Sequence, residues 1–92
     1  MSDVTVTHNE ARSRWEAHLD GELAGFAAYR VAGDKLVFDH TSVSSAFGGR
    51  GIAGELAKAS LDDARAQGKT VVPQCSFYAK YIAKNPQYAD LT

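Results

Sequence analysis

The sequence has few of the features that mark a secreted, membrane-bound or metal-dependent protein. Cys75 is the single cysteine among 92 residues, so no disulfide can form within the chain. The N-terminus has no apolar segment of the kind found in signal peptides or membrane spans. No pair of carboxylates and no Cys/His cluster has the spacing of metal ligands, so no metal is expected. We therefore expect a reduced, cytoplasmic protein.

An excess of charge of either sign is missing as well. The 10 lysines and arginines and the 11 aspartates and glutamates give a formal net charge of -1 and are mixed along the chain. Such a chain has no large field to attract DNA, RNA or an anionic membrane, and none of these is an expected partner. The 45% hydrophobic content fits one domain over residues 1–92, since a chain of this length buries roughly 60–65% of its unfolded surface.

The first half of the chain is typical of an antiparallel meander. Turn sequences at Asp20-Gly21 and at Gly33-Asp34 separate runs rich in β-branched and aromatic residues. Strands are expected over Val4–His8, Arg14–Leu19, Leu23–Val31 and Leu36–Val43. In the fourth strand, simple alternation places Leu36, Phe38 and His40 on one face and Val37, Asp39 and Thr41 on the other.

The pattern changes at Gly51. Apolar residues recur at helical spacing from Ala53 to Ala64, and Gly68 is a typical stop, so a helix of about four turns is expected. Its charges at Lys58, Asp62, Asp63 and Arg65 are expected to be solvated. Thr70–Cys75 predicts a strand parallel to the fourth. A short helix with Phe77, Tyr81 and Ile82 inward follows, and then a tail, which makes the fold α+β.

The junction between the halves, "SAFGGRGIAGEL" (Ser45–Leu56), is rich in glycine. Gly49, Gly51 and Gly54 satisfy the dinucleotide pattern G-x-G-x-x-G. That pattern belongs near the start of a doubly wound parallel sheet, whereas four antiparallel strands precede it here. A nucleoside triphosphate loop is also disfavoured, because no Lys-Ser or Lys-Thr follows the glycines.

An anion is nevertheless expected where this loop meets the helix. The first N–H groups of a helix lack intrahelical partners, the helix dipole adds partial positive charge there, and Arg50 would add a charge-assisted bond. The alternative is a glycine-rich turn whose N–H groups face only water.

The order of elements and the residue sequence of the loop resemble those of the GNAT superfamily of acetyl-CoA-dependent N-acetyltransferases. In that superfamily the fourth strand leads into an R/Q-x-x-G-x-G/A loop whose amides hold the pyrophosphate of coenzyme A. The corresponding window here is Gly48 to Ala53, with Gly48 where arginine or glutamine is usual. "HTSV" (40–43), "GRGIAGEL" (49–56) and "VVPQCSFYAKYIAKNPQYADL" (71–91) resemble, in order, the signature segments of its small stand-alone branch, often called YjdJ-like.

The resemblance implies a site for acetyl-CoA as cosubstrate and for an unidentified amine acceptor. The backbone of Thr41, Ser42 and Val43 would pair with the pantetheine arm like an added strand. Members of this branch lack the helices that wall the acceptor site, and only Asn9–Ser13 separates the first two strands here. The loop residues implied in cofactor binding are Gly48, Gly49, Arg50, Gly51, Ile52, Ala53 and Gly54.

Three residues are implied in catalysis. Cys75 would lie at the thioester and would carry an acetyl-cysteine intermediate. His40 would deprotonate the amine or orient Cys75, and Tyr81, or Tyr78 before it, would protonate the coenzyme thiolate. Each has a plain structural alternative: a small core cysteine, a structural histidine and ordinary aromatic packing.

The expected function is acetyl transfer from acetyl-CoA to an amine. Two alternatives stay open: a coenzyme A or acyl-CoA binding module without turnover, and a protein-interaction domain that uses an exposed sheet edge. His8, Trp15 and His18 are expected on strand faces.

Overall fold

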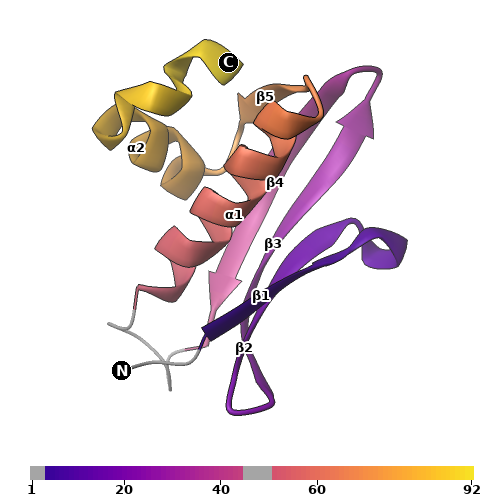
Figure 1. The fold of residues 1–92 in the computed structure, drawn as a ribbon, viewed down its shortest axis with the longest axis vertical. Coiled ribbons are helices and arrows are strands. Elements are labelled where there is room, and N and C mark those ends of the chain that lie inside the picture. The colour runs from indigo at the N-terminus through magenta and orange to yellow at the C-terminus, as the bar shows by residue number, and fades with distance from the viewer. Residues whose placement is uncertain (1–3, 45–50) are drawn as a thin grey trace.

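Residues 4–44 and 51–92, which the computed structural model describes, form a five-stranded sheet in the order β1-β2-β3-β4-β5, with α1 across one face (Figure 1). The strands are β1 (Val4–Asn9), β2 (Arg14–Leu19), β3 (Glu22–Ala32), β4 (Lys35–Val43) and β5 (Thr70–Pro73). Neighbouring strands are antiparallel except β4 and β5, which are parallel. The helices are α1 (Ile52–Ala66) and α2 (Ser76–Lys84), with 3-10 turns η1 (Glu10–Arg12) and η3 (Pro86–Leu91). The predicted α+β meander is confirmed.

Tight turns keep the meander local in sequence. Asp20 and Gly21 join β2 to β3 with φ angles of 53° and 82°, and aspartate and glycine are among the residues that tolerate this left-handed conformation best. The whole connection between β1 and β2 is one 3-10 turn, η1. No helix among the described residues is long and apolar enough to cross a bilayer.

The core lies between the sheet and the apolar face of α1. Ala17, Ala27 and Phe38 contribute from the sheet, and all three are completely buried. Small alanines let the helix approach the strands closely, and larger residues fill the space beside them. Helix α1 buries Ile52, Leu56, Ala57, Ser60, Leu61 and Ala64.

Helix α2 packs through a residue that the sequence did not single out as inward. Tyr78 is completely buried and stacks on Phe38, with ring centroids 4.5 Å apart. Its hydroxyl lies 2.7 Å from Ser60 Oγ of α1. Ile82 is buried as predicted, whereas Phe77 and Tyr81 are only partly buried.

The expected tail is wrong, because the last residues form η3 and pack onto α1. Tyr88 and Leu91 are buried. The Tyr88 hydroxyl donates to Asp62 at 2.7 Å, and the Arg65 guanidinium pairs with Asp90 at 2.8 Å. Two charges expected to be solvated therefore help to hold the C-terminus.

A β-bulge in β4 overturns the predicted alternation. Phe38 pairs with Tyr29 and His40 with Ala28, so Asp39 is an extra residue in β4. Beyond the bulge every side chain changes face. His40 therefore lies on the helix-free face, 5.7 Å from the ring of Phe26, and not on the face of Phe38.

Candidate functional site

The parallel strands β4 and β5 separate soon after they meet. Their register runs from Lys35 opposite Thr70 to Phe38 opposite Pro73. The Cys75 N–H then donates to the Phe38 carbonyl at 2.8 Å. Strand β4 continues to Val43, and within the described residues no strand pairs with this last part on the β5 side. We call this gap, bounded by residues 39–43 and by Cys75, the notch.

The backbone of β4 presents hydrogen-bonding groups to the notch. Ser44 N–H donates to Ala24 of β3 at 2.8 Å, so its backbone points away from the notch. Successive residues of a strand direct their N–H and C=O groups to alternate edges. Thr41 and Val43 therefore turn theirs toward the notch, whereas the backbone of Ser42 turns toward β3.

Cys75 lies at the N-cap of α2, where it faces Thr41 across the notch. The thiol is partly buried, and its sulfur lies 3.3 Å from Thr41 Oγ1. Burial raises the pKa of Cys75, but the Thr41 hydroxyl and the backbone amides of Phe77, Tyr78 and Thr41 outweigh it, so the net pKa is lowered. The structure thus brings Cys75 together with Thr41, while the predicted partner His40 lies on the opposite face.

Helix α1 begins near the same end of β4 (Figure 1). Gly51 is its N-cap in a left-handed conformation, with φ 70° and ψ 20°, and a residue without a Cβ adopts this at least cost. The first intrahelical bond runs from Glu55 N–H to Gly51 O at 3.1 Å, so the N–H groups of Ile52, Ala53 and Gly54 precede it. The predicted residues Gly48, Gly49 and Arg50 lie outside the described residues.

The two candidate tyrosines have different surroundings. Tyr81 is partly buried, and its ring comes within 3.9 Å of where a Cβ on Gly54 would be. Burial raises the pKa of its hydroxyl. Tyr78 has its hydroxyl engaged by Ser60 inside the core, and burial raises its pKa strongly. Only Tyr81 lies beside the start of α1 with its side chain partly open to solvent.

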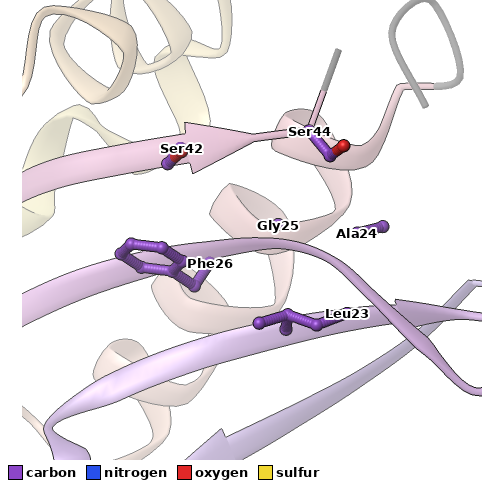
Figure 2. A pocket seen from close by; sticks show the side chains of 6 residues that line it. All are labelled: Leu23, Ala24, Gly25, Phe26, Ser42 and Ser44. Atoms are coloured by element: carbon purple, nitrogen blue, oxygen red, sulfur yellow. The ribbon is translucent and has the colours of Figure 1, made fainter. Parts of the chain in front are cut away.

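A hollow of about 190 Å³ is found between β3 and the end of β4 (Figure 2). Leu23 and Phe26 supply apolar side chains, while Ser42 and Ser44 supply hydroxyl groups. The Arg14 guanidinium lies 4.8 Å from the centre of the Phe26 ring. Of these residues, Ser42 was expected to bind the coenzyme, whereas Arg14, Leu23, Phe26 and Ser44 were not expected at any site. Which residues of β2, β3 and β4 are neighbours depends on two bulges that no composition pattern reveals.

Among the described residues, no three histidine, cysteine or acidic side chains form a group that could hold a metal ion. The arrangement is instead suited to an extended ligand with amide groups and an anionic end: backbone donors and acceptors along β4, amide N–H groups at α1, and a thiol between them.

Comparisons with known proteins identify the family of the chain. A family model described as GCN5-related N-acetyl-transferase matches residues 14–91. Protein NATD1 of Xenopus tropicalis is 34% identical over 87 residues, covering 92% of this chain and 80% of that protein. Protein NATD1 of Homo sapiens is 33% identical over 85 residues, covering 90% of this chain and 75% of that protein.

Solved structures show the same fold. The solution structure of a GCN5-like protein from Staphylococcus aureus superposes with a TM-score of 0.74 at 27% identity, covering 99% of this chain and 89% of that chain. The crystal structure of nourseothricin acetyltransferase gives a TM-score of 0.55 at 19% identity, covering 76% of this chain and 56% of that chain. The second likeness concerns the fold alone.

Proposed function

Because this chain belongs to the GCN5-related N-acetyltransferase family, we propose that it binds acetyl-CoA in the notch and transfers the acetyl group to an amine. The observation that carries the proposal is the position of Cys75. Its sulfur, with a lowered pKa, faces Thr41 of β4, where the thioester would lie if the coenzyme ran along that strand.

Each part of the coenzyme has a partner in this arrangement. The pyrophosphate takes the N–H groups at the start of α1, from Gly51 to Gly54, together with Gly48, Gly49 and Arg50, which precede them in the sequence. The pantetheine amides pair with the backbone of Thr41 and Val43, as an added strand would. Ser42 contributes its side chain to the hollow on the helix-free face.

The chemistry uses Cys75 as the first acceptor. Its thiolate attacks the carbonyl carbon of the thioester, the bond from that carbon to the coenzyme sulfur breaks, and coenzyme A leaves as a thiolate. The raised pKa of Tyr81 keeps its hydroxyl protonated at neutral pH, so this residue can donate a proton to the departing sulfur. An amine then attacks the acetyl-cysteine and restores the thiolate.

His40 fits the second step better than the first. It lies on the helix-free face and not beside Cys75, so an amine that approaches from that face would meet it. An imidazole nitrogen there can accept the proton that the amine must lose before or during attack. Direct attack of the amine on the thioester, with His40 as base, is the other route, and Cys75→Ala separates the two.

The coenzyme-binding part is tested by a matched pair of glycine variants. Gly51 and Gly33 have φ angles of 70° and 65°, and a Cβ at either would meet no atom within 4 Å. Gly51→Val and Gly33→Val therefore carry similar backbone strain. We expect only Gly51→Val to weaken acetyl-CoA binding, by about tenfold or more in titration calorimetry. Equal affinities of the two variants for acetyl-CoA would contradict the assignment of the pyrophosphate to the start of α1.

The transfer part is tested by following free thiol and protein mass after mixing with acetyl-CoA. Coenzyme release together with a 1:1 acetyl adduct on Cys75 supports the covalent route. Cys75→Ala should keep coenzyme affinity but lose the adduct. If Cys75→Ala still acetylates a test amine at the wild-type rate, the amine attacks the thioester directly.

A binding module without turnover is a second candidate. The connection η1 between β1 and β2 is a single turn, Glu10–Arg12, so no helices from this connection wall an acceptor site. A module of this kind would be stabilised by about 2.7 kcal/mol at a hundredfold excess of coenzyme over its dissociation constant. It would release no thiol.

A further inference from the structure

A second cavity, of about 220 Å³, lies between the sheet and the C-terminal part of α1. Tyr29, Val31 and Leu36 line it from β3 and β4, and Asp63 and Gln67 line it from the helix. This region is distinct from the notch, because Leu36 belongs to the stretch where β4 and β5 are still paired. A ligand in this cavity would not need the proposed transfer of acetyl groups.

Three rings hold one wall of this cavity in place. His8 stacks on Trp15 with ring centroids 4.3 Å apart and an angle of 3° between the planes. His8 Nε2 also lies 2.6 Å from the Tyr29 hydroxyl, within hydrogen-bonding distance. Trp15 and Tyr29 pack against the core on the helix-covered face of the sheet, and His8 stacks on Trp15 there. The rings are thus ordered by their own contacts.

The helix does not fill the space opposite these rings. Closer to its N-terminus, α1 packs Leu56 and Leu61 into the core. At the cavity it presents the polar side chains of Asp63 and Gln67 instead. Val31 supplies an apolar wall and is 61% exposed. Aromatic and aliphatic walls with acidic groups at the margin are therefore open to a ligand.

The charges around the cavity are unbalanced. Glu10 and Asp63 carry two negative charges, Lys69 carries one positive charge, and His8 lies among them. Burial first, and then the charges of Glu10 and Asp63, raise the pKa of the Tyr29 hydroxyl. The negative field of both carboxylates therefore reaches the aromatic wall.

We propose that this cavity binds a small organic cation, an amine or quaternary ammonium with an apolar substituent. Rings of tryptophan and tyrosine attract such cations through their π faces, and carboxylates at the margin add Coulomb attraction. The volume is below the roughly 300–1,000 Å³ of pockets for drug-sized ligands, so the ligand is small.

Trp15 reports on this cavity directly, because it is the single tryptophan of the chain. The probe is benzyltrimethylammonium, and benzyl alcohol is the neutral control with the same ring. The full chain is titrated with each while Trp15 fluorescence and ¹H–¹⁵N spectra are recorded. We expect saturable changes at the indole N–H of Trp15 and at Tyr29 and Asp63 with the cation, and changes at least about fivefold weaker with the alcohol.

Two variants that each remove one negative charge test whether the Asp63 carboxylate attracts the cation. Asp63→Asn should weaken binding of the cation by about fivefold, because it removes a negative charge at the cavity. Asp20→Asn removes a charge from the β2–β3 turn, which does not line the cavity, and should leave the affinity unchanged. Glu10→Gln provides a second test at the same margin.

Three results would overturn the proposal. The first is the absence of a saturable response to the cation. The second is an equal response to benzyl alcohol, which would make the cavity a general apolar hollow. The third is an equal loss in Asp63→Asn and Asp20→Asn, which would show an effect of net charge alone.

Discussion

Tyr78 and Ser60 join α2 to α1 through a buried pair of hydroxyl groups, and the structure fixes which one donates. Ser60 Oγ lies 2.8 Å from the Leu56 carbonyl and 3.1 Å from the Ala57 carbonyl. A serine hydroxyl has one hydrogen, and these carbonyls can only accept it. The Tyr78 hydroxyl, 2.7 Å from Ser60 Oγ, must therefore be the donor of the bond between them.

This direction predicts that the cost of Tyr78→Phe depends on residue 60. In the wild-type protein the change removes one hydrogen bond but leaves Ser60 bonded to its carbonyls, so it should cost about 1 kcal/mol. Ser60→Ala instead leaves a completely buried tyrosine hydroxyl without an acceptor, a penalty of about 1–3 kcal/mol that alanine's helix propensity offsets by about 0.5 kcal/mol. Adding Tyr78→Phe to Ser60→Ala removes the orphaned group and should be neutral or stabilising.

The assay is a double-mutant cycle on four proteins, with urea unfolding followed by circular dichroism. The coupling energy should be about 1–3 kcal/mol. A loss of 1 kcal/mol should lower Tm by about 4–8 °C in a domain of this size. If Tyr78→Phe costs the same with serine and with alanine at position 60, the two hydroxyl groups do not stabilise each other.

Three further outcomes are expected. Thr41→Val removes a hydroxyl that lowers the pKa of Cys75, so the pH profile of iodoacetamide alkylation should move to higher pH, whereas Thr41→Ser should keep the wild-type profile. The pKa of Asp62 is lowered below its usual 3.8, first by the hydrogen bond from Tyr88. The ionised Asp62 therefore stabilises the folded protein above pH 3.8, and this stabilisation is lost as the pH falls through the lowered pKa. Tyr88→Phe should therefore show a smaller drop of Tm between about pH 5 and pH 2 than the wild type. Gly25→Ala would place a Cβ 2.8 Å from a backbone oxygen of β4 and should cost about 1–3 kcal/mol in urea unfolding.

The strands and α1 could be predicted because each has a local signal. Turn residues such as Asp20 and Gly33 bound the strands, and helical spacing from Ala53 to Ala64 marks α1. The face of His40 could not be predicted, because one extra residue in β4 reverses all later side chains and leaves the local composition unchanged.

For the candidate site, the order of the segments along the chain could be read from the sequence, but the contacts between them could not. The parallel strand was expected over Thr70–Cys75, but β5 ends at Pro73, and Cys75 follows it as the N-cap of α2. The contact between Cys75 and Thr41 depends on that same bulge, which brings the Thr41 side chain to the helix-covered face of the sheet. The docking of η3 was missed because Tyr88 and Leu91 are too few and too closely spaced to show a period.

Pro73, the last residue of β5, also bears on how the protein behaves in concentrated solution. Strand β5 is an outer strand of the sheet and is only four residues long. A proline has no N–H to offer a neighbouring molecule, and a short outer strand gives little length for pairing between molecules. This border of the sheet is thereby protected against aggregation, and Pro73→Val is the substitution that would weaken that protection.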